Sequence, residues 1–279
     1  MTRGARGRAT PGSQAGPIVF SHANGFPAGV YRPLFDRWRE HGFRVHAVEK
    51  FGHDPAWPVT SNWPHLRDQL IAYIDREVGA PAWLVGHSLG GMLSVLAASK
   101  RADLARGVVL LDSPIIAGWR AHSLQVAKAT GLMRRVSPGR VSRSRRQAWP
   151  SLAAVREHFA RKSAFARWDP RVLEAYVKSG FVRQGGQTVL AFDRDVETQI
   201  YDTLPHHMQR VLRRHPLHCP LSFIGGLQSV ESRQAGLEAT RRLAGTRFVW
   251  TRGTHLFPME HPDETATEVL RLLTAMAER

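Results

Sequence analysis

Apolar and polar positions along the chain fall into short apolar runs separated by longer stretches with helical spacing. In those stretches, apolar residues recur at intervals of three and four, as one face of an amphipathic helix requires. We expect strands at 17–21, 43–48, 82–85, 107–111, 221–225 and 246–250, and helices at 31–41, 66–78 and 234–243, with a last helix from Pro262. Strands that alternate with helices join through right-handed crossovers into a parallel sheet. The pattern therefore predicts an α/β fold with a mostly parallel, doubly wound sheet.

This alternation stops in the middle of the chain. Residues 114–204 have a mainly helical pattern with interruptions at 137–139, 169–170 and 185–186. The glycine pair at 185–186 is followed by residues typical of strands, so that stretch is also compatible with a short strand pair. We expect a core of residues 17–113 and 205–279, a mainly helical lid or cap at 114–204 inserted into it, and a disordered basic tail at 1–16.

One motif carries most of the chemical information. The apolar residues 82–85 lead into Gly86-His87-Ser88-Leu89-Gly90, and a good helix former follows at 92–98. A Gly-x-Ser-x-Gly motif between a strand and a helix is typical of a nucleophile elbow, in which small residues let neighbouring backbone pass close to a strained turn. Such a turn aims the Ser88 hydroxyl out of the sheet. It also places the backbone N–H of Leu89 at a helix N-terminus, where negative charge is stabilised.

Together with three further segments, this motif resembles the α/β-hydrolase superfamily over about residues 17–279. In chain order the four segments are 21–26 (Ser-His-Ala-Asn-Gly-Phe), 86–91 (Gly-His-Ser-Leu-Gly-Gly), 110–114 (Leu-Leu-Asp-Ser-Pro) and 253–262 (Gly-Thr-His-Leu-Phe-Pro-Met-Glu-His-Pro). The resemblance implies that Ser88 is the nucleophile and that His255, which follows the final strand, is its general base.

The same resemblance sets an expectation for the size of the sheet. The family's full core begins with two strands before the one that leads into the first of these segments. Only about 16 polar residues precede Pro17. We therefore expect at least one of those two strands to be missing and favour the loss of both, which leaves about six main strands.

The acid of the triad is less clearly indicated. The resemblance places an aspartate shortly after the next-to-last strand, but that position holds Ser229 or its neighbours. Some family members take the acid from the end of an earlier strand, which here ends at Asp112, on the same edge of the sheet as His255. We favour Asp112 and keep Glu231 as the alternative, with a dyad or another partner as a third reading. Asp112 is also compatible with an ordinary turn or N-cap role.

An oxyanion hole needs two backbone donors. The elbow supplies the N–H of Leu89, and the resemblance places the second donor in the loop after the first strand. That donor is the N–H of Asn24 if His22-Ala23 replaces the family's usual His-Gly pair. It is the N–H of Phe26 if Asn24-Gly25 is the equivalent pair. The position of the strand end favours Asn24.

The chain is strongly basic, with a formal charge of +16 and a pI near 11.3. Basic residues are densest between Arg134 and Arg146, where Ser, Pro and Gly among the arginines favour a solvated, mobile loop over a patch for an anionic partner. No recognition helix, zinc finger or set of stacking aromatics accompanies the charge. Nucleic acid is therefore not expected as the main partner. The oligomeric state is left open.

Several classes are excluded by what the sequence lacks. The single cysteine, Cys219, rules out an intrachain disulfide and a cysteine zinc cluster, and we expect it to be a small buried filler. No apolar run approaches the roughly 20 residues of a membrane helix, and no secretory signal pattern follows the basic start. We expect a cytoplasmic protein. Neither a dinucleotide-binding motif, a P-loop nor a metal motif appears, so no cofactor is expected.

These features predict a serine hydrolase that cleaves a carboxylic ester, or a related thioester or lactone, of a small or medium apolar acyl substrate through an acyl-enzyme. Serine at position 88, where the resembling dehalogenases and epoxide hydrolases use aspartate, argues against those reactions. Aromatic residues of the lid would line an apolar pocket as well as form the lid's own core. Two alternatives stay open: carbon–carbon bond cleavage or acyl transfer on the same fold, and a non-catalytic member that uses the pocket for binding.

Overall fold

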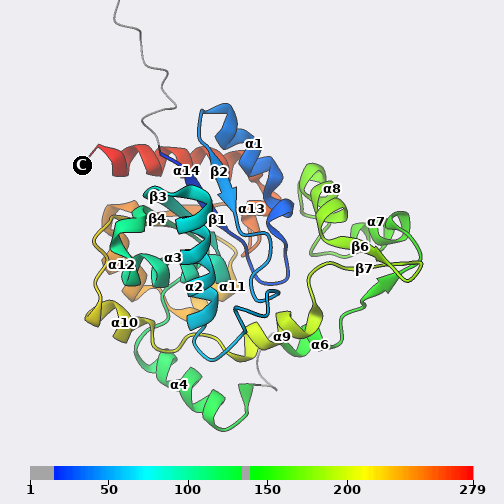
Figure 1. Ribbon diagram of the computed structural model, residues 1–279, viewed down its shortest axis with the longest axis horizontal. Helices are drawn as coiled ribbons and strands as arrows, with labels where there is room; N and C mark the ends of the chain where they lie inside the picture. The colour runs from blue at the N-terminus through cyan, green and yellow to red at the C-terminus, as the bar shows by residue number, and fades with distance from the viewer. Residues whose placement is uncertain (1–15, 134–138, 279) are drawn as a thin grey trace, which may run out of the picture.

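Six parallel strands form the central sheet of the computed structural model, which describes residues 16–133 and 139–278 (Figure 1). Their order across the sheet is β2-β1-β3-β4-β8-β9. They are β1 (Ile18–Ser21), β2 (Val45–Ala47), β3 (Ala82–His87), β4 (Ala105–Leu111), β8 (Leu221–Gly226) and β9 (Phe248–Thr251). The prediction of a mostly parallel sheet of about six main strands is confirmed. Because the winding direction reverses between β1 and β3, the carboxyl ends of these two strands flank the crevice where open α/β sheets bind ligands.

The sheet is buried on both faces because successive side chains of its strands enter two separate cores. Val19 and Leu84 belong to one core, whereas Phe20, Trp83 and Val85 belong to the other. All residues of β1 and β3 are buried. The short apolar runs in the sequence are therefore the strands of a sheet that is covered on both faces. Only the carboxyl ends of the strands are then available for functional residues.

Helices cover both faces of this sheet. The core that contains Val19 includes residues of α2, α3, α10 and α12. The core that contains Phe20 includes residues of α1, α13 and α14. Helices α1 and α14 pack side by side (Figure 1). The helices are α1 (Arg32–Glu40), α2 (Pro64–Tyr73), α3 (Leu89–Lys100), α10 (Met208–Arg214), α12 (Glu238–Ala244), α13 (Phe257–Glu260) and α14 (Pro262–Ala277).

One of two predicted helices differs from the observed structure at a glycine. The predicted helix 234–243 is wrong as a single element, because Gly236 has φ +82° and separates α11 (Val230–Ala235) from α12. No residue inside a right-handed helix adopts a positive φ. The predicted helix 66–78 continues from α2 through a π-helical turn and ends at Gly79, which also has a positive φ.

The chain between β4 and β8 forms an insertion with its own small sheet. Up to residue 202, its described elements are α4 (Gly118–Ala129), α6 (Gly139–Arg143), β5 (Ala148–Trp149), α7 (Leu152–Ala160), α8 (Pro170–Ser179), β6 (Phe181–Gln184), β7 (Gln187–Leu190) and α9 (Arg194–Asp202), and α10 follows before β8. Strands β6 and β7 are the strand pair that the glycines at 185–186 suggested, and both glycines have the positive φ that a tight hairpin turn requires. Figure 1 shows α7, α8, β6 and β7 gathered in one lobe, with α4 apart from them. The domain boundaries at 113/114 and 204/205 stay predictions.

Part of the arginine-rich segment is more ordered than its composition suggested. Residues 134–138 of this segment, like residues 1–15 of the predicted tail, lie outside the described residues. The interpretation as a loop is wrong for residues 139–143, which form α6, and Arg145 in the turn that follows is held by an acid of α9. Arg143 pairs with Asp202 at 3.0 Å and Arg145 pairs with Glu197 at 2.8 Å. These partners lie more than fifty residues further along the chain, where no local pattern reveals them.

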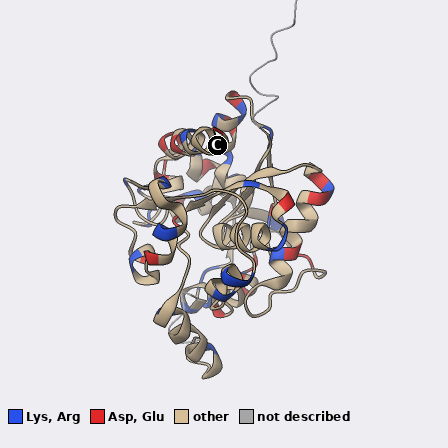
Figure 2. Cartoon of the chain, turned by 90° about the vertical axis from the view of Figure 1, so that its left-hand side faces the viewer, with Lys and Arg blue, Asp and Glu red and all other residues tan. Residues whose placement is uncertain are grey.

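In the view of Figure 2, acidic and basic residues both occur along the chain and are not separated into two regions. Within 16–133 and 139–278, no helix combines the length and the apolar character that crossing a membrane requires.

The close approach of backbone at the elbow gives a first prediction. An added Cβ at Gly90 would lie 2.0 Å from the carbonyl oxygen of Ser21, which belongs to β1 and has no room to move. We expect Gly90→Ala to lower the free energy of unfolding by about 3 kcal/mol or more, as overpacking against backbone does. Urea denaturation followed by circular dichroism measures this.

Gly79→Asn is the matched control. Gly79 has φ +62° and nothing lies within 4 Å of the position of a Cβ. Asparagine tolerates the left-handed region, so the loss of stability should stay below about 1 kcal/mol. Equal losses in the two variants would show that the approach of Ser21 adds nothing to the cost of a side chain at position 90.

Candidate active site

Ser88 occupies a strained turn between β3 and α3. Its backbone angles are φ 54° and ψ −115°, a region that non-glycine residues enter only when their surroundings impose it. The surroundings do so here, because the Ser88 N–H donates to Leu111 of β4 and the Ser88 carbonyl accepts from the Ser113 hydroxyl at 2.6 Å. Gly86 lies so close to Gly90 that an added Cβ would be 2.3 Å from its carbonyl carbon.

Helix α3 begins directly at this turn. Leu89 is its first residue, and the N–H of a first helical residue has no acceptor within the helix. The N–H therefore stands beside Ser88 at the positive end of the helix dipole. This is the location that the sequence analysis gave to the first oxyanion donor.

The structure brings Asp112 and His255 together. Nδ1 of His255 lies 2.7 Å from Oδ2 of Asp112, whose side chain is fully buried. The same carboxylate accepts a hydrogen bond from the Gly226 N–H at 2.9 Å and one from the Ser229 hydroxyl at 2.5 Å. Asp112 follows β4 with φ 43°, and this unusual backbone angle turns its side chain toward the end of β8. The side chain of His255 is 19% exposed, so its ring is open on one side.

These contacts shift the pKa values of both groups in the directions that an ion pair requires. Burial tends to raise the pKa of Asp112, but the hydrogen bond and positive charge of His255, with Ser229 and Gly226, hold that pKa below its ordinary value. Burial tends to lower the pKa of His255, and the hydrogen bond and charge of Asp112 overcome it and raise that pKa above 6.5. The imidazolium of His255 is thus favoured beside a carboxylate that stays ionised.

Glu231, the alternative acid, has a different place. No hydrogen bond between Glu231 and His255 is recorded among the described residues, and its charge has the smallest of the recorded effects that raise the pKa of His255. Ser229 stands where the resemblance expected an aspartate, and its hydroxyl donates to Asp112. The serine is therefore a partner of the carboxylate that comes from the earlier strand.

The loop after β1 approaches the same edge of the sheet. The N–H of Ala23 donates to the Tyr31 hydroxyl at 3.1 Å, and the N–H of Phe26 donates to the Ala23 carbonyl at 3.2 Å. No acceptor is recorded among the described residues for the N–H of Asn24, whose side chain donates to the Glu197 carbonyl at 2.9 Å. Of the two donors considered from the sequence, Phe26 is engaged in a turn, and Asn24 has the freer backbone N–H.

Sequence reasoning missed a chain of hydrogen bonds behind the site. Nε2 of His87 lies 2.8 Å from the carbonyl of His255, and a carbonyl only accepts, so Nε2 carries the hydrogen. Nδ1 of His87 then accepts from the Tyr31 hydroxyl at 2.7 Å, and the Tyr31 oxygen accepts from Ala23. Burial and the neighbouring His255 lower the pKa of His87 to about 3, which keeps it neutral. Tyr31 and His87 are far apart in sequence, so no spacing signals this contact.

A second missed residue, Glu260, shapes the loop that carries His255. Its side chain is 2% exposed and accepts from the N–H of Thr254 at 2.9 Å and from the Thr254 hydroxyl at 2.7 Å. Gly253 has φ +108°, and a Cβ there would lie 2.6 Å from the Glu260 carboxylate. The only sequence signal was the position of this glutamate between two prolines after the histidine.

Other candidates for chemistry lie outside this cluster. Cys219 is half-buried against the apolar core, and burial raises the pKa of its thiol to about 11. A thiol with such a pKa is a poor nucleophile near neutral pH. Within the described ranges, no group of three or more His, Cys, Asp or Glu side chains is arranged to hold a metal ion.

The chain belongs to the α/β hydrolase family. The sequence model described as "Alpha/beta hydrolase family" matches residues 18–268, which include the whole six-stranded sheet. The chain is 35% identical over 103 residues to 2-(acetamidomethylene)succinate hydrolase of Mesorhizobium japonicum, a match that covers 35% of this chain and 36% of that protein. It is 28% identical over 130 residues to monoglyceride lipase of Rattus norvegicus, covering 43% and 42% of the two chains.

Similarity of structure extends further than similarity of sequence. A crystal structure of E-2-(acetamidomethylene)succinate hydrolase superimposes with a TM-score of 0.72 at 24% identity, covering 95% of this chain and 92% of that one. At such identity the comparison shows a shared fold. The matched sequence stretches span between 11% and 42% of the length of the curated relatives.

The hydrogen bonds behind the site give a second prediction. Tyr31→Phe removes the hydroxyl between Ala23 and His87 and leaves a buried N–H and a buried ring nitrogen without their partner. We expect the free energy of unfolding to fall by about 1–3 kcal/mol, which urea denaturation measures. Tyr73→Phe is the control: Tyr73 is half-buried, so water can replace its hydroxyl as the partner of the Ala47 backbone, and the loss should be about 0.5 kcal/mol or less. Equal losses would contradict the assigned network.

Proposed function

We propose that this protein is a serine hydrolase that cleaves a carboxylic ester, or a related thioester or lactone, through an acyl-enzyme. The observation that carries the proposal is the buried carboxylate of Asp112 bonded to Nδ1 of His255, at the sheet edge where the strained turn presents Ser88. Nδ1 is occupied by the carboxylate, so Nε2 is the nitrogen left to exchange a proton with the nucleophile. Ester and related hydrolysis is also in keeping with a family whose members include a lipase and a succinate-derivative hydrolase.

In the first half of the reaction, the acyl group is transferred to the enzyme. Ser88 Oγ adds to the carbonyl carbon as its proton passes to Nε2 of His255, and the carbonyl electron pair moves onto oxygen. The N–H groups of Leu89 and Asn24 stabilise that oxyanion. The carbonyl then re-forms, the bond to the alcohol oxygen breaks, and the leaving alkoxide takes the proton from His255.

In the second half, water releases the acid. A water molecule adds to the acyl carbon while His255 accepts its proton, and the second oxyanion forms at the same two N–H groups. Its collapse breaks the bond to Ser88 Oγ, which regains the proton from His255. Asp112 stays ionised throughout, because it holds the imidazole in one tautomer and stabilises the imidazolium without taking its proton.

The first test of this proposal is covalent labelling. An alkyl fluorophosphonate should add once to the wild-type protein, with fluoride as the leaving group, and intact-mass spectrometry should show no adduct on Ser88→Ala. Ser163→Ala, which removes an exposed hydroxyl from the insertion, should keep the adduct. A folded wild-type protein that takes no label, or that takes it at another residue, would remove the basis for Ser88 as nucleophile.

The pH dependence tests the assignment of the acid. The base must be neutral, and the pKa of His255 is raised above 6.5, so kcat/KM should fall as the pH drops through that raised value. Asp112→Asn removes the carboxylate whose hydrogen bond and charge do most to raise this pKa, so the acidic limb should move to lower pH. The wrong tautomer should also cost about 10⁴-fold in kcat.

Glu231→Gln is the matched comparison, because Glu231 raises the same pKa without a recorded hydrogen bond to His255. We expect a small shift of the acidic limb in the same direction and a change in kcat of about threefold or less, as for a screened charge. Loss of most turnover in Glu231→Gln, with Asp112→Asn still active, would assign the acid to Glu231 instead.

A further inference from the structure

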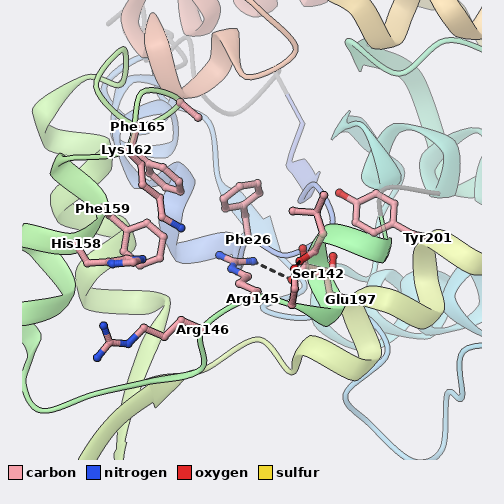
Figure 3. Close-up of a pocket in the computed structure, with 13 residues that line it drawn as sticks. Phe26, Ser142, Arg145, Arg146, His158, Phe159, Lys162, Phe165, Glu197 and Tyr201 are labelled. Atoms are coloured by element: carbon pink, nitrogen blue, oxygen red, sulfur yellow. Dashed lines mark hydrogen bonds and ion pairs between the residues drawn. The ribbon is translucent and has the colours of Figure 1, made fainter. Parts of the chain in front are cut away.

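A cavity of about 540 Å³ lies where the insertion meets the loop after β1 (Figure 3). Phe26 of that loop forms one part of its wall, and side chains from α6, α7, α9 and the segments next to them form the rest. Phe159 and Phe165 add further apolar surface. Since Phe26 is two residues from Asn24, the cavity opens beside the loop that holds the proposed second oxyanion donor.

One ion pair in this wall is fixed to the oxyanion loop. Arg145 donates to Glu197 at 2.8 Å and to the Tyr176 hydroxyl at 2.5 Å. The Glu197 carboxylate packs so closely on Gly25 that an added Cβ would lie 2.8 Å from its oxygen. Both charges of this pair are therefore matched within the protein, and Glu197 is the one carboxylate in the wall.

Two further cations of the wall have no such match. Within the described residues, no acidic partner is recorded for Lys162 or Arg146. Lys162 lies over the Phe159 ring at 5.1 Å, and Arg146 donates to a backbone carbonyl and lies over a tryptophan ring. Burial and the neighbouring Arg145 lower the pKa of Lys162, so the charges recorded near this ammonium are repulsive. Nε2 of His158, in the same wall, is buried and has no partner among the described residues.

An unmatched cationic wall beside an apolar one is suited to a chain that ends in an anion. We propose that the substrate is an ester whose acyl or alcohol part carries a carboxylate or similar anionic group, which this cavity binds through Lys162 and Arg146. The aromatic side chains would contact the carbon chain that connects the anion to the scissile carbonyl. This inference rests on the proposed function, and it turns the expected apolar substrate into one with a charged end.

The experiment compares esters that differ in one charge. The first pair is the 4-nitrophenyl monoester of adipic acid and 4-nitrophenyl hexanoate, with the charge on the acyl side. The second is the hexanoate ester of 4-hydroxybutanoate and that of 1-butanol, with the charge on the alcohol side. We expect wild-type kcat/KM to favour the charged ester in at least one pair, and added salt to reduce that preference.

Lys162→Met should lower this preference by about three- to tenfold, since a partly exposed cation is replaced by an uncharged chain of similar length. Activity on the neutral ester should change by about twofold or less. Lys178→Met is the control, because it makes the same change in net charge on α8, where Lys178 pairs with Glu174 and does not line the cavity. It should leave the preference unchanged.

The outcomes separate this inference from the function on which it rests. Turnover without a preference for charge, or a preference that Lys162→Met leaves intact, overturns the anion site and leaves the serine hydrolase standing. If no ester is cleaved and Ser88 takes no label, the proposed function fails. Calorimetric titration of adipate into Ser88→Ala protein then tests the anion site independently of catalysis. Binding that Lys162→Met weakens about three- to tenfold supports it, and absence of binding overturns it.

Discussion

A single buried carboxylate holds the candidate site together. The Asp112 side chain has no exposure to solvent, and a charge in that position is costly unless its oxygens are satisfied by donors. Its donors come from three separate places: the backbone of Gly226 at the end of β8, the hydroxyl of Ser229 at the start of α11, and the ring of His255 after β9. Burying the charge therefore fixes the ends of β4, β8 and β9 relative to one another, and the position of the imidazole follows from that requirement.

A neutral set of hydrogen bonds supports this charged pair from behind. His87 anchors the backbone of His255, yet its own pKa of about 3 keeps it uncharged. A cation at that distance from His255 would oppose the imidazolium, because like charges lower the pKa of a neighbouring base. Tyr31 extends the same support to Ala23 in the loop after β1, which holds the proposed second oxyanion donor. In the proposed mechanism, neutral groups thus supply orientation, and stabilisation of the developing charge is left to Asp112.

The sequence predicts features that depend on a few neighbouring residues. It leaves open the contacts that depend on the order of the strands in the sheet. The strands and the turn at Ser88 are encoded in runs of a few residues, and both were expected from pattern alone. Asp112 could only be favoured, because its approach to His255 depends on β4 and β8 being neighbours, which no local pattern states. From the sequence, Ser229 was noted only because it stands where the family places an aspartate. In the structure its hydroxyl donates to Asp112, the carboxylate on the earlier strand. Arg145 was assigned to a mobile loop because its acid lies on another helix.

That acid, Glu197, links the insertion to the loop after β1. Its backbone carbonyl accepts from the Asn24 side chain, and its carboxylate pairs with Arg145 while packing on Gly25. Interiors packed this closely transmit displacement, so a shift of α9 would move the proposed oxyanion donor. The pairing also has an electrostatic consequence. Because Arg145 is matched, the unmatched positive charge of the cavity belongs to Lys162 and Arg146. The two proposals therefore assign attraction of an anion and activation of a carbonyl to different groups, and the first can vary without disturbing the second.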